Sequence, residues 1–241
     1  MMVFNLIHDE WIPVKRADGA RQIIAPWQLT AYIELNPIVS LDASRPDFNG
    51  SMIQFLIGLV QTTMAPVNDR EWKNTLKKPP KPRNLRDVFE KVSNAFNLDD
   101  DGPRFMQDFN LDDGTENEID VLLVEMPGEK TIEENKDHFL KRGSVKKICL
   151  KCCAIALFSL QTNAPSGGQG NRTSLRGGGP LTTIVLGTNL WETVWMNTLN
   201  EDFFSRLGDM SKSNGANIFP WLGPTHRSEE HTSELQSPNT I

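Results

Sequence analysis

The sequence has no apolar run long enough to cross a membrane, and it has only three cysteines in 241 residues. A transmembrane helix needs about 20 predominantly apolar residues, and the first residues lack the basic and then apolar pattern of a signal peptide. Cys149, Cys152 and Cys153 are clustered and odd in number, unlike the disulfide framework of a secreted protein. These absences predict a cytoplasmic protein with no membrane partner.

Motifs of common nucleotide-binding enzymes are missing as well. Gly167-Gly-Gln-Gly170 is not followed by the Lys-Ser/Thr pair of a P-loop, and no dinucleotide fingerprint follows a strand. No nucleophile is evident that could work with His138 as a general base. We therefore expect no catalytic centre. A phosphate- or nucleotide-binding enzyme that uses His138 and the glycine-rich loop is the alternative.

Acidic residues are absent from residues 139–191, although the chain carries a formal charge of −6. Six of the 17 glycines lie within residues 166–180 of this stretch. Lys and Arg supply countercharge for phosphate, and glycine lets the backbone come close to a ligand. The stretch therefore predicts a polyanion as partner. Its seven cations are Lys141, Arg142, Lys146, Lys147, Lys151, Arg172 and Arg176.

Hydrophobic periodicity predicts helices and short strands without a regular βαβ order, which favours an α+β fold with short antiparallel strands. Strands are expected at 119–124, at 181–186, and in an opening hairpin formed by 3–7 and 21–24 around the polar turn 16–19. Helices are expected at 26–34, 51–64, 85–96, 148–160 and 190–199, and from an N-cap at Asp69 through Leu76. The three prolines within 77–83 predict a stiff, solvated connector, although its charges could also contact nucleic acid.

Two segments on either side of the expected 148–160 helix combine the residue types that contact nucleic acid. In the first, Phe139 could stack or wedge between bases while Lys141 or Arg142 pairs with phosphate. In the second, glycines precede Asn171 and Arg172. The candidate DNA-binding residues are Asp137, His138, Phe139, Lys141, Arg142, Ser166, Gly167, Gly168, Gln169, Gly170, Asn171 and Arg172.

Cys149 and Cys152 have the spacing of half a tetrahedral zinc site. The alternative is that all three cysteines are small core residues of the apolar helix. A thioredoxin-type redox pair is disfavoured, because no strand precedes the motif.

Four stretches of the sequence resemble the family of the large subunit, CasA, of the type I-E CRISPR Cascade complex. The resemblance implies a non-catalytic subunit of an RNA-guided complex, which recognises the protospacer-adjacent motif in duplex DNA and helps to start strand separation. The implied partners are target double-stranded DNA, the guide RNA, the other Cascade subunits and a recruited effector nuclease-helicase. The stretches are Leu6-Ile-His-Asp-Glu-Trp-Ile-Pro-Val14, Cys152-Cys-Ala-Ile-Ala-Leu-Phe158, Asn163-Ala-Pro-Ser-Gly-Gly168 and Leu175-Arg-Gly-Gly-Gly-Pro-Leu-Thr-Thr183.

The resemblance also assigns parts of the chain. The loops that approach the DNA motif in the family correspond by position to 137–143 and 166–170. Residues 1–225 correspond to an incomplete N-terminal domain, because the family's C-terminal helical bundle is missing. Some relatives carry a second Cys-x-x-Cys in that later part, which leaves zinc open for the intact protein. Residues 226–241 resemble a translated sequencing-library adapter and are expected to be a disordered, non-native tail.

Overall fold

The structure is a computed structural model in which the chain forms two compact units. Unit 1 comprises Met1–Asn110 and Thr183–Ile241, and unit 2 comprises Leu111–Thr182. Unit 1 is therefore discontinuous in sequence, since the chain leaves it, forms unit 2 and returns. Within the described ranges, every helix is too short or too polar to span a bilayer. The structure describes residues 3–108, 116–138, 140, 143, 145–165, 174–179, 181–206 and 218–223.

Unit 1 contains a small antiparallel sheet of three strands in the order β2-β1-β3. The strands are β1 (Ile12–Arg16), β2 (Arg21–Ile24) and β3 (Ile38–Leu41). Together with the helices, this sheet confirms the predicted α+β class. Pairing joins Ile12 to Ile24 across the hairpin, and both side chains are buried.

The predicted hairpin is present, but the residues predicted for its first strand are wrong. The arm is β1 rather than residues 3–7. Arg16 and Ala20 close the turn, with the Arg16 N–H donating to the Ala20 carbonyl at 2.9 Å, and Gly19 adopts φ +89°. A turn this tight joins only the strands directly next to it, and its left-handed residue favours glycine.

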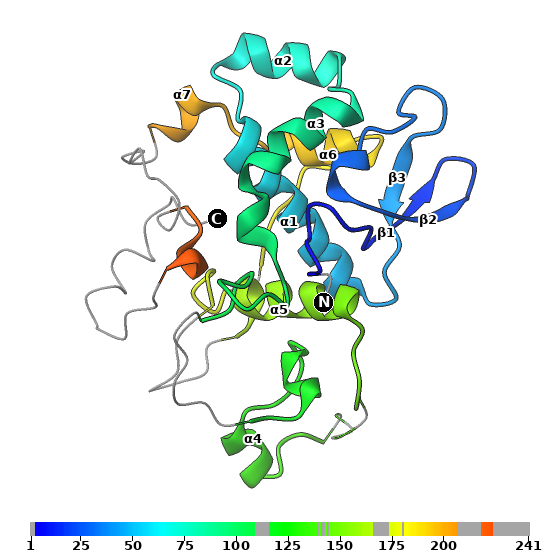
Figure 1. The fold of residues 1–241 in the computed structure, drawn as a ribbon. Coiled ribbons are helices and arrows are strands. Elements are labelled where there is room, and N and C mark those ends of the chain that lie inside the picture. The colour runs from blue at the N-terminus through cyan, green and yellow to red at the C-terminus, as the bar shows by residue number, and fades with distance from the viewer. Residues whose placement is uncertain are drawn as a thin grey trace. The chain divides into compact units, whose positions relative to one another are not determined.

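Helix α1 (Pro46–Met64) runs through the middle of unit 1, with α3 and α6 beside it and the sheet on one side (Figure 1). It confirms the predicted helix over 51–64 and begins five residues earlier, at a proline whose fixed φ suits a first helical turn. The apolar spacing of three and four residues forms its buried face, which includes Met52, Phe55, Leu56, Leu59 and Val60.

Helix α2 (Asp69–Lys77) is attached to α6 (Leu190–Met196) by indole hydrogen bonds. The Trp72 Nε1–H donates to the Thr198 carbonyl at 2.9 Å. The Trp195 Nε1–H donates to the Trp72 carbonyl, also at 2.9 Å. The two helices are more than 100 residues apart in the sequence, so this contact returns the chain to unit 1 after unit 2.

The N-cap of α2 is Asn68, not Asp69 as the sequence suggested. The Asn68 Oδ1 accepts hydrogen bonds from the backbone N–H groups of Arg70 and Glu71, both at 3.1 Å. Asp69 instead accepts a hydrogen bond from Asn200 Nδ2 at 2.6 Å. Asn and Asp are both favoured at N-caps, so sequence alone does not separate these neighbours.

The predicted helix over 85–96 is split into α3 (Pro82–Phe89) and a 3-10 helix, η2 (Glu90–Phe96). Phe96 ends η2 inside an aromatic cluster, where its ring stacks on Phe105 with centroids 5.5 Å apart. Phe55 of α1 meets Phe96 edge-on at 5.9 Å, so α1 and η2 share one core. The remaining short elements of unit 1 are η1 (Pro26–Gln28), α7 (Glu201–Phe204) and η5 (Pro220–Leu222).

Both predicted strands outside the hairpin are wrong. Residues 119–122 form the 3-10 helix η3, in which local bonds such as Leu123 N–H to the Asp120 carbonyl at 2.9 Å satisfy the backbone. Residues 181–187 have no regular structure. There the Asn197 side-chain amide pairs with both the N–H and the carbonyl of Val185, at 2.9 and 2.8 Å. Residues 181–186 thus have a strand-like sequence pattern, but Val185 pairs with a side chain rather than with another strand.

Replacement of Asn68 by alanine should destabilise unit 1 by about 1 kcal/mol, because two backbone donors lose their cap. Urea unfolding followed by tryptophan fluorescence measures this change. Asn74→Ala, on the same helix but away from its start, is the matched control and should not destabilise the protein. Equal midpoints for Asn68→Ala and the unsubstituted protein would contradict the assigned cap.

Candidate nucleic-acid interface

Only part of the predicted DNA-binding set lies in the portion of the chain that the structure describes. Asp137 and His138 are described, as are the two candidate metal ligands, Cys149 and Cys152. All of these residues belong to unit 2. The predicted residues outside the described ranges are Phe139, Lys141, Arg142, Ser166, Gly167, Gly168, Gln169, Gly170, Asn171 and Arg172.

Helix α5 (Leu150–Asn163) separates the two predicted segments and confirms the helix expected over 148–160. Its buried residues Ile155, Ser159 and Thr162 are spaced by four and three, so they share one face. The helix begins after Cys149, whose backbone is extended, and ends before Pro165, which cannot continue it. The hydrophobic pattern placed this element to within three residues at either end.

The end of α5 also holds the chain that follows the glycine-rich segment. The Leu175 N–H donates to the Gln161 carbonyl at 2.9 Å, and the Arg176 N–H donates to the Thr162 carbonyl at 3.3 Å. The last carbonyls of a helix lack partners within the helix, so these bonds satisfy them. As a result, the residues before and after 166–173 are both positioned by the last turn of α5.

Before α5 in the chain, the buried carboxylate of Asp120 holds the backbone at Gly143, the last residue of the first predicted segment. Asp120 is 4 % exposed, and its Oδ2 accepts a hydrogen bond from the Gly143 N–H at 3.1 Å. Gly143 has φ +63°, which favours glycine. Sequence reasoning missed this role, although an acidic residue inside the apolar run 119–124 was a signal for it. A buried carboxylate needs such a partner.

His138 is exposed, and no described residue forms a hydrogen bond with its side chain. A histidine acting as a general base normally has a group that orients the ring and a nucleophile within hydrogen-bond reach. The described surroundings of His138 supply neither. The enzyme alternative therefore has no support from this part of the chain.

The cysteines at the start of α5 differ in environment. Cys149 is exposed, whereas Cys152 and Cys153 are partly buried. The Cys152 backbone N–H donates to the Cys149 sulfur and lowers the pKa of that thiol. Burial raises the pKa of Cys152 to about 11, and its hydrogen bond to Cys149 adds to the rise. Burial likewise raises the pKa of Cys153.

A zinc ion could use part of this arrangement. The Cys149 and Cys152 side chains are close enough to hydrogen-bond to each other, which suits two ligands of one tetrahedral ion. A structural zinc site needs four ligands. Among the described residues, no group of three or more His, Cys, Asp or Glu side chains is placed to hold a metal. The two thiols thus fit half of a site.

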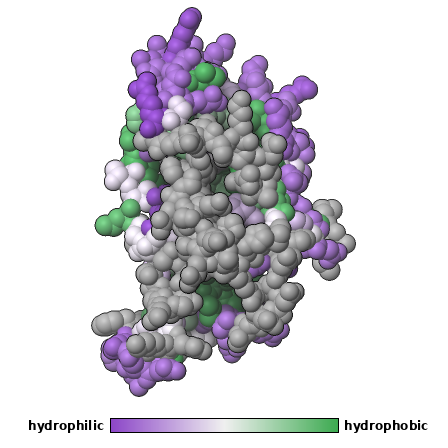
Figure 2. Space-filling view, turned by 90° about the vertical axis from the view of Figure 1, so that its left-hand side faces the viewer, coloured by the Kyte–Doolittle hydropathy of each residue, from purple (hydrophilic) through white to green (hydrophobic). Residues whose placement is uncertain are grey.

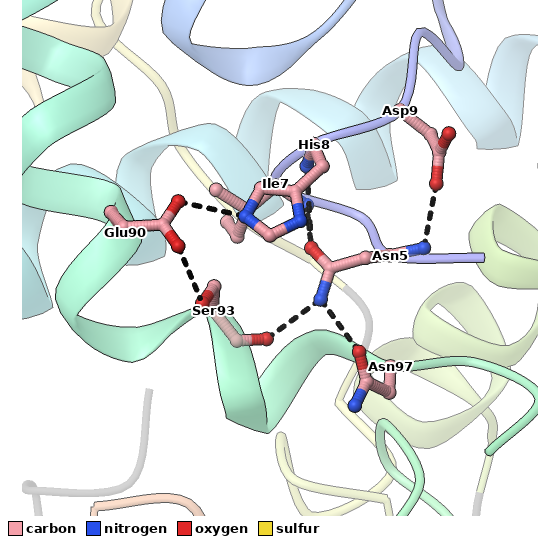
Figure 3. Close-up of polar contacts among 7 residues, drawn as sticks. All are labelled: Asn5, Ile7, His8, Asp9, Glu90, Ser93 and Asn97. Carbon is pink, nitrogen blue, oxygen red and sulfur yellow. Dashed lines mark hydrogen bonds and ion pairs between the residues drawn. The ribbon is translucent and has the colours of Figure 1, made fainter. Parts of the chain in front are cut away.

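The N-terminal motif at 6–14 has a structural role, which Figure 3 shows. The Asn5 Nδ2 donates to the Ser93 carbonyl at 2.8 Å and to the Asn97 Oδ1 at 2.7 Å. The Asn5 Oδ1 accepts the Ile7 N–H at 2.9 Å, and His8 Nε2 lies 2.7 Å from a Glu90 carboxylate oxygen. These contacts join the N-terminus to η2. No pattern in the sequence had singled out Asn5.

Because a lowered pKa increases the thiolate fraction at a given pH, Cys149 should be alkylated at lower pH than the other two cysteines. Iodoacetamide labelling over a pH series, followed by peptide mass mapping, measures the order. Cys153→Ser should keep the fast-reacting site and Cys149→Ser should lose it. Faster labelling of Cys152 than of Cys149 would contradict the assigned environments.

Comparison with known proteins identifies the family. The model of the family described as CRISPR-associated protein Cse1 matches residues 5–241. The Thermobifida fusca Cse1 structure superposes with a TM-score of 0.70 at 19 % identity, covering 98 % of this chain and 46 % of that chain. Thermus thermophilus CasA (Cse1) gives a TM-score of 0.61 at 19 % identity, covering 94 % and 44 %.

A chain described as part of a CRISPR RNA-guided surveillance complex also shares the fold, with a TM-score of 0.59 and 15 % identity. The match covers 82 % of this chain and 44 % of that chain. This protein therefore spans less than half the length of these relatives. The resemblance to CasA found in the sequence is confirmed, since the Thermus thermophilus structure carries both names. With the family model matching nearly its whole length, this chain belongs to the CRISPR-associated Cse1 family.

Proposed function

We propose that this chain is part of a non-catalytic subunit of a cytoplasmic, RNA-guided CRISPR surveillance complex. The observation that carries the proposal is membership of the Cse1 family. The fold shared with a chain of a CRISPR RNA-guided surveillance complex supports it. In such an assembly, the guide RNA and the other Cascade subunits are the expected partners. Target double-stranded DNA and a recruited effector nuclease-helicase would bind to the assembled complex.

Within that role, we propose that the subunit recognises the protospacer-adjacent motif in duplex DNA and helps to start unwinding. The acid-free stretch 139–191 supports this proposal, because its charge suits a DNA backbone. Lys146 and Lys147 precede α5, are exposed, and form no ion pair with a described carboxylate. The glycine-rich segment can lie close to a groove because it lacks side-chain bulk.

Charge reversal at Lys141, Arg142 and Arg172 tests this function in the assembled complex. The triple Glu variant should lose motif-dependent duplex binding, because reversed charges remove the phosphate contacts that would position Phe139 and the glycine-rich segment against the bases. Binding to a library of duplex targets with randomised flanking bases measures the motif preference.

The matched control reverses three exposed cations outside unit 2, Lys15, Lys91 and Arg206, and changes the total charge equally. It should retain the motif preference. An unchanged preference in the Lys141, Arg142 and Arg172 variant would overturn the proposal. Nucleotide turnover that disappears in His138→Ala would favour the enzyme alternative.

We also propose that Cys149 and Cys152 are two of the four ligands of a structural zinc ion in the full-length protein. Zinc binding would link the start of α5 to the remaining ligands and stabilise the fold. Elemental analysis of full-length protein should find about one zinc ion, and Cys149→Ser with Cys152→Ser should lose it. Cys153→Ser is the control and should keep the metal. Full-length protein without zinc would contradict this assignment.

A further inference from the structure

A second concentration of positive charge lies in unit 1, on α2, on the connector that follows it and on the first half of α3. Residues 70–86 contain seven cations and one carboxylate, Glu71, a net charge of +6 in a chain of −6. The segment is separate from the acid-free stretch 139–191, which supports the proposed motif recognition. Its cations are Arg70, Lys73, Lys77, Lys78, Lys81, Arg83 and Arg86.

Three of these cations, which we name the α2 stripe, lie on one face of a helix. Arg70, Lys73 and Lys77 are spaced by three and then four residues, so their side chains project from the same side of α2. Trp72 and Leu76 are half-buried on a different face. The positive charge is therefore segregated on the outer side of the helix.

The acidic residues at the start of α2 are occupied by contacts within the protein. The Glu71 Oε2 accepts the Val67 N–H at 2.8 Å, and the Asp69 Oδ1 accepts a hydrogen bond from Asn200 at 2.6 Å. Both carboxylates thus hold the first turn of the helix. Neither forms an ion pair with the α2 stripe within 4.0 Å.

The α2 stripe is exposed. All three side chains are accessible to solvent, and none of them pairs with a described carboxylate. Hydrophilic residues dominate the top of the view in Figure 2, where Figure 1 places α2. Of residues 66–90, only Val67 is a large hydrophobic residue that is exposed. Protein interfaces are depleted in Lys and enriched in aromatic residues, so this surface does not suit a protein partner.

The frame that carries these charges is rigid. The Asn68 cap fixes the start of α2, and the indole bonds of Trp72 and Trp195 attach the helix to the turn after α6. Lys78 is the C-cap of α2, and Pro79 and Pro80 fix φ in the short connector that follows it. Pre-organised cations lose less conformational entropy when they bind an anion.

We propose that the α2 stripe binds the phosphodiester backbone of duplex DNA without reading its sequence. From Arg70 to Lys77 the helix rises about 10 Å, which matches about three base-pair steps of 3.4 Å. Three cations on one face can therefore contact phosphates within a run of about four along one strand. The surface would add sequence-independent affinity for duplex DNA, a role that rests on the function proposed above.

Replacing Arg70, Lys73 and Lys77 by glutamine tests the proposal. Anisotropy of a short fluorescent duplex of arbitrary sequence measures affinity as a function of salt. Loss of three phosphate contacts should make the slope of log affinity against log salt shallower by about 2.7. Affinity should fall by the same factor for duplexes of any sequence.

The matched control replaces Lys15, Lys91 and Arg206 by glutamine, so the total charge changes equally but the α2 stripe remains. This control should keep the steeper slope. Equal slopes for the two variants would overturn the proposal, as would preference of the unsubstituted chain for single-stranded RNA or an acidic protein. Far-UV circular dichroism checks that both variants remain folded. If the Arg70, Lys73 and Lys77 variant lost only its motif preference and kept its salt dependence, the result would bear on the proposed motif recognition. It would contradict the role proposed for the α2 stripe.

Discussion

The two indole hydrogen bonds between Trp72 and the end of α6 are the contact on which the organisation of unit 1 depends. In each bond, a buried or half-buried indole N–H donates to a backbone carbonyl. Together the two bonds join segments that are more than 100 residues apart in the sequence. Trp195 also stacks on Trp191 with ring centroids 5.4 Å apart, so the contact continues into the core. Gln61 bonds the Leu199 backbone through both amide atoms, which attaches α1 to the same turn. Unit 1 is therefore closed by residues on either side of unit 2.

Unit 2 contains two stretches rich in glycine or positive charge, and hydrogen bonds hold the chain at an end of each. Such loops have little apolar surface to bury, so their neighbours must define their ends. Asp120 does this at Gly143, and the last turn of α5 does it at Leu175 and Arg176. A single buried carboxylate thus serves as a fixed anchor within a strongly acidic stretch of sequence.

The fold class and most helices could be predicted from the sequence, because the apolar spacing in α1 and α5 repeats over several turns. Strands were harder to predict. Residues 181–186 have a strong β pattern, but a strand forms only where another strand is available to pair. The N-cap at Asn68 and the role of Asn5 were missed because each depends on which backbone groups lie nearby in space.

The sequence by itself determined the segregation of charge, the positions of the amphipathic helices and the motifs that identify the family, since each is a property of order along the chain. The tertiary structure alone decided that α2 is attached to α6 and that Glu71 and Asp69 are turned to backbone and side-chain donors. The prolines and lysines of residues 77–83 indicate a solvated connector when read in order. The attachment of α2 depends on the long-range contacts of Trp72 with Thr198 and Trp195, and such contacts between distant segments cannot be read from local pattern.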